Sequence, residues 1–254
     1  MRKTRLTNLP APYLKRLSVR EDASLGGDYP FNLPWLDVEF SLDFVTPVTI
    51  IVGENGTGKS TLIEAVAALC GYDEAGGGKG YRPLDHSRAV DRSGALLASA
   101  LRASWLPKVT AGWFFRAESF FSVARFLDEA ARDANAAPPD FLSWSHGEGF
   151  VRFFEERMSR QGIYFLDEPE SALSPKRQLE LLRLLNQIQA SASAQIIMAT
   201  HSPILMAVPG ARLLEITRGG LMETELRETR HFRLYQDFAS NPEDFIERAL
   251  RDEV

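Results

Sequence analysis

Hydrophobic residues follow two patterns along the chain, short apolar runs and longer stretches with a helical period. Three short runs rich in β-branched or aromatic side chains are typical of buried strands: Val48–Val52, 162–166 and 194–199. Three longer stretches have the length and apolar spacing of helices: 60–70, 147–158 and 175–189. Because these strands and helices alternate, the sequence predicts an α/β fold around a largely parallel sheet.

Other segments follow different patterns. Residues 13–48 alternate apolar and polar side chains around prolines, which predicts an antiparallel layer of strands joined by turns. The glycine-rich segment 71–94 predicts a long mobile loop. The remaining predicted elements are a strand over 109–116, a helix over 119–134, a hairpin formed by 211–217 and 221–227, and a helix over 242–251 capped by Asn241.

A glycine-rich turn joins the first buried strand to the helix that follows it. Residues 53–60 read Gly-Glu-Asn-Gly-Thr-Gly-Lys-Ser, which matches the phosphate-loop pattern G-x4-G-K-[ST]. Glycines let backbone N–H groups point inwards around a phosphate, and the N-terminus of the next helix adds partial positive charge. Lys59 is expected to contact the terminal phosphates and to act in catalysis, and the Ser60 hydroxyl to ligate Mg²⁺. The residues predicted to bind the nucleotide here are Gly53, Glu54, Asn55, Gly56, Thr57, Gly58, Lys59, Ser60 and Thr61.

Polar residues also follow the other two buried strands. Asp167 and Glu168 come directly after 162–166, and one residue separates His201 from the end of the strand 194–199. Asp167 is predicted to hold Mg²⁺ through water, as the second acidic element of P-loop enzymes does. Glu168 is predicted to polarise the attacking water as general base, and His201 to contact the γ-phosphate and orient that water. This arrangement favours hydrolysis over phosphate transfer to a second substrate.

Composition narrows the class of protein. The 254 residues are 44% hydrophobic and 25% charged, which is ordinary for globular proteins, and the net charge of −5 gives no overall electrostatic reason for nucleic-acid binding. Cys70 is the only cysteine, so no intrachain disulfide can form and a reducing compartment fits. No stretch approaches the ~20 apolar residues that cross a bilayer, and no signal peptide is evident. We therefore expect a cytoplasmic protein with no direct membrane insertion.

The order of these motifs resembles that of the ABC-type ATPases, and within them the small stand-alone ATPases near the SMC and RecF branch. The resemblance rests on five segments that follow one another in this order: 53–60, 145–148, 166–169, 171–173 and 200–201. It implies an α/β P-loop NTPase fold of the ABC-type head, with a central mainly parallel sheet, an N-terminal antiparallel strand layer and a small helical lobe. It also implies a single domain over 1–254, with the helical and signature lobe inserted at about 95–160.

The same resemblance implies ATP and Mg²⁺ as ligands and a head-to-tail homodimer that forms with ATP. In this class the signature segment of one subunit faces the phosphate loop of the other. Ser145, Gly147 and Glu148 are therefore expected to contact the partner's nucleotide. Glu118 takes the place of the glutamine that usually contacts the metal in this class. A base-stacking aromatic is expected within 13–44, with Phe31, Trp35 and Phe40 as unranked candidates.

The process that hydrolysis would drive is left open. We expect a DNA-linked, regulatory or defence-linked role, with DNA or a protein as client. One alternative is the nucleotide-binding subunit of an ABC transporter, although the segment between 118 and 145 is short for a membrane-docking lobe. A second alternative is a slow-turnover, ATP-gated interaction module, because Trp144 and His146 depart from the usual Leu-Ser-Gly-Gly signature.

Overall fold

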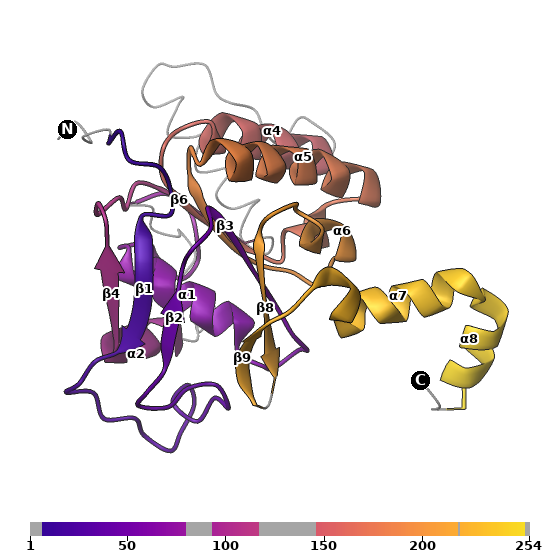
Figure 1. Cartoon of the computed structure of the whole chain (residues 1–254), viewed down its shortest axis with the longest axis horizontal. Helices are drawn as coiled ribbons and strands as arrows, with labels where there is room; N and C mark the ends of the chain where they lie inside the picture. The colour runs from indigo at the N-terminus through magenta and orange to yellow at the C-terminus, as the bar shows by residue number, and fades with distance from the viewer. Residues whose placement is uncertain (1–6, 80–92, 117–145, 218, 252–254) are drawn as a thin grey trace.

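The computed structural model has a central parallel sheet with helices on both faces (Figure 1). It describes residues 7–79, 93–116, 146–217 and 219–251. Within these residues the central sheet has six strands, in the order β5-β6-β7-β3-β8-β9, and only the β8–β9 pair is antiparallel. The strands are β3 (Val48–Val52), β5 (Gly112–Arg116), β6 (Ile163–Asp167), β7 (Gln195–Ala199), β8 (Arg212–Thr217) and β9 (Gly220–Glu223).

A smaller antiparallel sheet covers one face of the central sheet, with the helices α1 and α2 on the same side. The sheet has the order β2-β1-β4, and its members are β1 (Leu14–Val19), β2 (Ser41–Asp43) and β4 (Leu101–Trp105). The helices on this side are α1 (Lys59–Leu69) and α2 (Ser93–Ala100). Ile51 of β3 belongs to the apolar core on this side, together with residues of α1, β1 and β2.

The opposite face of the central sheet carries a second apolar core. Its helices are α4 (His146–Met158), α5 (Pro175–Ser191) and α6 (Pro203–Met206). Ile50 and Val52 point into this core, whereas Ile51 between them points into the first, as the two-residue period of a strand requires. All five residues of β3 are buried, because both faces of the strand are covered.

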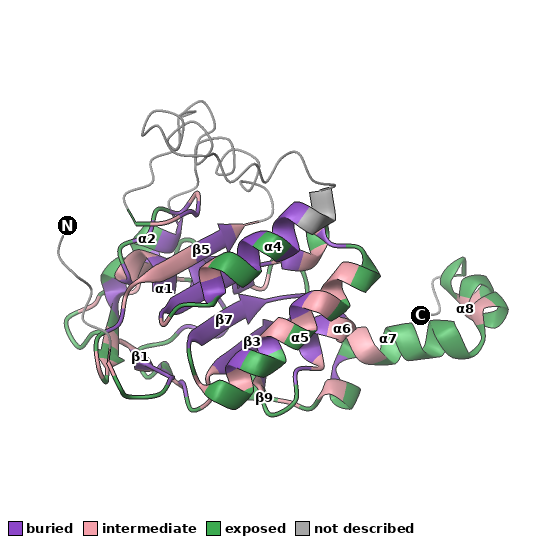
Figure 2. Ribbon diagram, turned by 90° about the horizontal axis from the view of Figure 1, so that it is seen from above, coloured by how far each residue is buried: buried purple, intermediate pink, exposed green. Residues whose placement is uncertain are grey.

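The C-terminal helices differ from the rest of the chain. After the 3₁₀ turn Leu226–Glu228, the helices α7 (Arg230–Ser240) and α8 (Pro242–Ala249) extend away from the sheet as an arm (Figure 1). Neither helix contains a buried residue, and Figure 2 shows this arm as largely exposed. The side chain of Asn241 accepts a hydrogen bond from the backbone N–H of Asp244, so the predicted cap of the last helix is confirmed.

The predicted fold class is confirmed: a mainly parallel central sheet and an N-terminal antiparallel layer are both present. Some elements differ from the sequence-based expectation. The helix α2, the strand β4 and the helix α7 were not predicted, and the second hairpin strand ends at Glu223 instead of 227. The strand β4 has only five residues, and its partner β1 lies more than eighty positions earlier in the chain.

Two further predictions concern the middle of the chain. The predicted helix over 119–134 and the predicted loop from residue 80 to 92 lie outside the described residues. Residues 71–79 are described, and Gly77 exchanges two backbone hydrogen bonds with Phe114 of β5. The range 95–160 predicted for an inserted lobe includes β4 and β5, which belong to the two sheets. The single-domain organisation stays a prediction.

Candidate functional site at the carboxyl edge of the sheet

The phosphate-loop residues form a tight turn between β3 and α1. Gly56 and Gly58 have φ angles of 77° and 91°, in the left-handed region that favours glycine. A Cβ atom at Gly58 would lie 2.6 Å from a methyl carbon of Leu33 and 3.1 Å from the indole nitrogen of Trp35. That nitrogen donates a hydrogen bond of 2.9 Å to the carbonyl of Thr57. The loop is therefore held from outside by the segment that precedes β2.

The aromatic residues predicted as candidates for base stacking have different environments. Trp35 and Phe40 are buried in the core beside the antiparallel sheet, and Phe31 packs against that core while partly buried. Tyr29 is 47% exposed, and its hydroxyl contacts the hydroxyl of Thr61 in the first turn of α1. Burial makes Trp35 and Phe40 structural side chains, and Tyr29 is an accessible ring that the sequence analysis did not consider.

Lys59 is the buried cation of the loop. Only 4% of the residue is exposed, and its Nζ donates a hydrogen bond of 3.0 Å to the carbonyl of Glu54. Burial lowers the pKa of Lys59, while the nearby carboxylates of Glu168 and Asp167 oppose this shift because they favour the charged ammonium. The ammonium therefore lies within the loop, close to the carboxylates of Asp167, which ends β6, and Glu168, which follows it.

Ser60 and Asp167 lie side by side at the end of β6. The Ser60 hydroxyl donates a hydrogen bond of 3.0 Å to Asp167 Oδ1, although the residues are 107 positions apart. A hydroxyl and a carboxylate oxygen are suitable ligands for Mg²⁺, which usually retains waters and binds through few carboxylates plus substrate phosphates. In the described part of the chain, no group of three or more His, Cys, Asp or Glu side chains could hold a metal. Ser60 and Asp167 could supply two ligands to a magnesium ion at this point.

An arginine that sequence analysis did not single out holds the other oxygen of Asp167. Arg116 is aligned with Asp167 across the β5–β6 pair, and its guanidinium lies 3.5 Å from Asp167 Oδ2. The same guanidinium is 2.6 Å from Glu64 Oε1 and donates to the carbonyl of Glu74. Burial raises the pKa of Glu64 to about 7, although Arg116 acts in the opposite direction. Arg116 thus compensates two buried carboxylates at once.

Glu168 and His201 meet at the same edge of the sheet. Asp167 is aligned with Ala199 in the parallel β6–β7 pair, so the residues that follow these two strands are neighbours. Glu168 has a left-handed backbone (φ 48°), and its N–H donates to the carbonyl of Ala199 at 3.0 Å. His201 Nε2 lies 3.3 Å from Glu168 Oε1, and its backbone N–H donates to a Glu170 carboxylate oxygen at 2.5 Å. Phosphate loop, carboxylate pair and histidine are thus brought to one site.

Two residues at the start of α7 also reach this site. His231 Nε2 lies 2.9 Å from His201 Nδ1, and a guanidinium nitrogen of Arg230 lies 3.3 Å from a carboxylate oxygen of Glu54. Burial lowers the pKa of both His201 and His231, and the Lys59 ammonium adds to the lowering at His201. Sequence analysis missed both α7 residues, because a single histidine or arginine on an unassigned segment carries no motif.

For four predicted site residues the structure gives no contact with the candidate site among the described residues. Glu118 and Ser145 lie outside the described residues. Gly147 and Glu148 lie in the first turn of α4, where the predicted helix is present. Their roles stay predictions.

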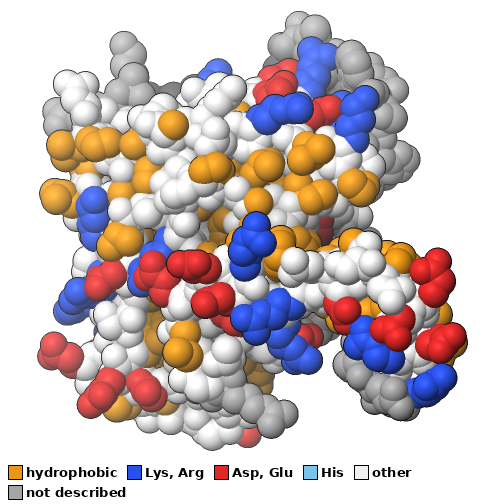
Figure 3. All heavy atoms as spheres, turned by 45° about the vertical axis from the view of Figure 1, so that its right-hand side comes forward, with side chains coloured by type: hydrophobic (Ala, Val, Ile, Leu, Met, Phe, Trp, Pro, Cys, Tyr) orange, Lys and Arg blue, Asp and Glu red, His pale blue; other side chains and the backbone are white. Residues whose placement is uncertain are grey.

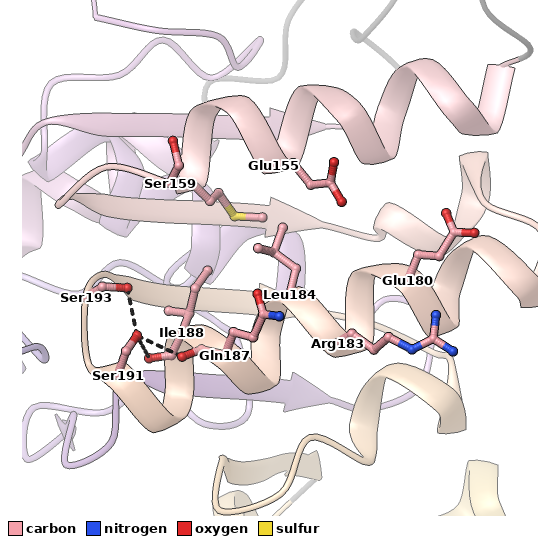
Figure 4. A pocket seen from close by; sticks show the side chains of 10 residues that line it. Glu155, Ser159, Glu180, Arg183, Leu184, Gln187, Ile188, Ser191 and Ser193 are labelled. Atoms are coloured by element: carbon pink, nitrogen blue, oxygen red, sulfur yellow. Dashed lines mark hydrogen bonds between the residues drawn. The ribbon is translucent and has the colours of Figure 1, made fainter.

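A groove of about 540 Å³ lies between α4 and α5, lined by residues such as Glu155, Glu180 and Arg183 (Figure 4). None of the phosphate-loop residues lines it, nor do Asp167, Glu168 or His201. This groove is therefore separate from the candidate site.

Comparison with protein families gives two matches. A model described as "AAA domain" matches residues 33–95, which contain the phosphate loop. A model described as "AAA domain, putative AbiEii toxin, Type IV TA system" matches residues 149–207, which contain the carboxylate pair and His201. No curated protein matches the sequence. Together the two matches support the resemblance to an ATPase domain, and such domains suggest nucleotide binding and hydrolysis.

Comparison with solved structures gives similar chains at low sequence identity. One is described as an "inward-facing conformation of a putative metal-chelate type ABC transporter" (18% identity, 87% of this chain and 88% of that chain, TM-score 0.46). A second is the SMC head domain from Thermotoga maritima (16% identity, 84% and 99% covered, TM-score 0.45). A third is the dimeric structure of MJ0796, a bacterial ABC transporter cassette (16% identity, 75% and 90% covered, TM-score 0.39).

One structural finding bears on the membrane. Among the residues that the structure describes, every helix is too short or too polar to span a lipid bilayer.

Proposed function

We propose that this chain binds ATP with Mg²⁺ at the phosphate loop and hydrolyses it, and that ATP closes a head-to-tail homodimer. The observation that carries this proposal is the meeting of the loop, Asp167, Glu168 and His201 at one edge of the sheet. A buried polar atom fits the same ligand. His201 Nε2 is buried and makes no hydrogen bond with the described protein residues, although it lies 3.3 Å from Glu168 Oε1. A phosphate oxygen could therefore accept a hydrogen bond from it.

Binding rests on the loop and the helix behind it. The backbone N–H groups of 53–60 and the N-terminus of α1 would hold the phosphates, and Lys59 would exchange its contact with the Glu54 carbonyl for the terminal phosphates. Ser60 and Asp167 would hold Mg²⁺, with Glu118 as a further metal residue. The ion supplies positive charge that stabilises the phosphates as negative charge develops on them.

Catalysis rests on Glu168 and His201. The Glu168 carboxylate would accept a proton from the attacking water, and His201 would orient that water and donate a hydrogen bond to the γ-phosphate. Both side chains come from turns whose backbone N–H groups are bonded: Glu168 N–H donates to the Ala199 carbonyl, and His201 N–H donates to the Glu170 carboxylate. The groups are therefore held near one another before a nucleotide arrives, which lowers the entropic cost of the reaction.

Dimerisation would complete the site. Gly147 and Glu148 in the first turn of α4, and Ser145 just before them in sequence, would contact the γ-phosphate bound by the partner, so that ATP itself lies in the interface. We propose a cytoplasmic protein with a regulatory, defence-linked or DNA-linked role, whose client is DNA or a protein. The toxin system named in the description of one matching family favours the defence-linked version of this role.

The test compares the parent protein with Glu168→Gln, which keeps the shape of the side chain and removes the base. We expect phosphate release to fall by about 10²–10³-fold. We also expect light scattering to show a doubling of mass for Glu168→Gln with Mg·ATP and none without. Lys59→Ala is the control that should lose both nucleotide binding and the change of mass.

Each outcome separates the alternatives. Hydrolysis by Glu168→Gln at the parent rate would disprove the role of Glu168 as base. A variant that binds ATP and stays monomeric would disprove the homodimer and favour a transporter subunit or another hetero-complex. A parent protein that dimerises with ATP but releases almost no phosphate would instead favour the slow-turnover interaction module. Ser145→Arg should block the dimer without weakening ATP binding by the monomer.

A further inference from the structure

The first turn of α7 is fixed at the candidate site, although the rest of the helix is exposed. Thr229 is fully buried and caps the helix, since its hydroxyl accepts a hydrogen bond from the backbone N–H of Phe232. His231 is half-buried, and its ring lies beside that of His201 with ring centroids 5.0 Å apart. Arg230 is paired with Glu54 of the phosphate loop. The cap and these two contacts hold the turn against the site.

The groups around His201 favour one of the two tautomers of its neutral imidazole ring. Of the two facing ring nitrogens, His201 Nδ1 and His231 Nε2, one must donate and the other accept when both rings are neutral. The other nitrogen of His201, Nε2, faces the Glu168 carboxylate at 3.3 Å. A lone pair at Nε2 would be repelled by this carboxylate, whereas an N–H is attracted. His201 therefore carries its proton on Nε2 and accepts at Nδ1 from His231 Nε2–H.

From this contact we propose that His231 is a positioning residue, which holds His201 in the tautomer and orientation needed to donate from Nε2 to the γ-phosphate. The proposal rests on the proposed ATPase function and deepens it. His231 does not itself touch the reacting atoms, because the ring of His201 stands between it and Glu168. The second ring nitrogen of a functional histidine is commonly fixed by such a partner, and the partner determines which tautomer is present.

The contact also connects the exposed C-terminal arm to the candidate site. His231 is carried by a helix with no buried residue, so its place depends on the Thr229 cap, the Arg230 pair and the His201 bond. Exposed apolar side chains continue along the arm: Leu234, Tyr235, Phe238, Ile246 and Leu250. Hydrophobic side chains are visible on the arm beside charged ones in Figure 3.

The test uses three substitutions on α7. His231→Leu removes the donor and keeps similar bulk, whereas His231→Gln places an amide N–H donor at a similar distance from the backbone. Gln236→Ala is the matched control on an exposed position of the same helix. We expect His231→Leu to lower kcat for ATP about tenfold, with KM changed less than twofold. We expect His231→Gln to recover kcat to within about threefold of the parent, and Gln236→Ala to match the parent.

A second measurement needs no nucleotide. Nitrogen-15 NMR of the imidazole groups reports which ring nitrogen carries the proton, and the chain has only four histidines to assign. We expect His201 to be protonated on Nε2 alone in the parent and in His231→Gln. In His231→Leu we expect a mixture of the two tautomers.

The results separate two kinds of failure. An inactive parent protein with the expected tautomers would disprove the ATPase function and leave the positioning contact supported. An active parent whose His231→Leu variant keeps both its kcat and its tautomer would disprove the positioning role. Equal losses in His231→Leu and His231→Gln would likewise overturn it, because the hydrogen bond would then not be the cause.

Discussion

The phosphate loop and the C-terminal arm meet where Arg230 pairs with Glu54, yet they are built in opposite ways. The loop is set between a fully buried strand and a helix with eight buried residues, and Leu33 and Trp35 press on it from outside. The arm has no buried residue in either helix, and its ion pairs, such as Arg248 with Asp237, are exposed to solvent. Surface pairs of this kind contribute little to stability.

The loop and the arm therefore differ in how strongly packing holds their geometry. Around the loop many contacts fix a single geometry, so a change there is expected to cost folding energy as well as activity. In the arm the first turn contacts the candidate site, and no residue of the two helices is buried by the described part of the chain. Regions with few buried contacts open at low free energy, which is a property that moving elements require.

The largest stability effect is expected when Arg116 is removed. Arg116→Met keeps most of the side-chain volume but removes the guanidinium that lies beside Glu64 and Asp167, both of which are buried. Breaking a buried pair in this way costs about 4 kcal/mol, because the remaining charges stay desolvated. Chemical denaturation of the nucleotide-free protein measures the change.

The loss should depend on pH in a defined direction. Burial raises the pKa of Glu64 to about 7 in the parent, and without Arg116 that pKa rises further. When the pKa of a carboxyl is higher in the folded state than in the unfolded state, the free energy of unfolding falls as pH rises between these two pKa values. The difference between parent and variant should therefore be larger at about pH 8 than at about pH 6. A difference that is the same at both pH values would contradict this account of Glu64.

A smaller effect is expected from Gly58→Ala. The new methyl group would meet Leu33 and the Trp35 indole, and an alanine would have to adopt a φ of 91°. Left-handed strain and crowding together should cost about 2 kcal/mol in the free energy of unfolding. Gly56→Ala is the matched control: it has a φ of 77°, but nothing lies within 4 Å of the new atom. It should lose only the strain, about 1 kcal/mol, and equal losses would show that contact with Leu33 does not matter.

The phosphate loop was predictable because its constraints are local in sequence. The glycines, the lysine and the flanking strand and helix lie within about twenty residues, and the same chemistry requires them at this spacing. The carboxylate pair and His201 were predictable for a related reason, since each follows a recognisable apolar strand. The parallel sheet then brings the ends of these strands together, which the predicted α/β pattern implied.

Arg116 and His231 were not predictable from such patterns. The place of Arg116 depends on the register of β5 against β6, where it stands opposite Asp167, and a register is not visible in a single strand. His231 lies 30 residues after His201, on a helix that was not predicted. The amphipathic spacing of this helix is a signal that could have predicted it, but the spacing does not indicate the contact of His231 with His201.

The smallest effect is expected in the arm, where two leucines give a matched test of the comparison. Leu185 of α5 is fully buried, and Leu234 of α7 is 47% exposed. Leu185→Ala should cost about 3 kcal/mol, since it leaves a cavity in the core beneath α4 and α5. Leu234→Ala should change the free energy of unfolding by less than about 0.5 kcal/mol, because little contact is lost.

Thermal or urea unfolding at several protein concentrations measures both changes. A large, concentration-dependent loss in Leu234→Ala would mean that a second molecule covers the arm in solution, and the contrast between the two regions would then describe an isolated subunit only.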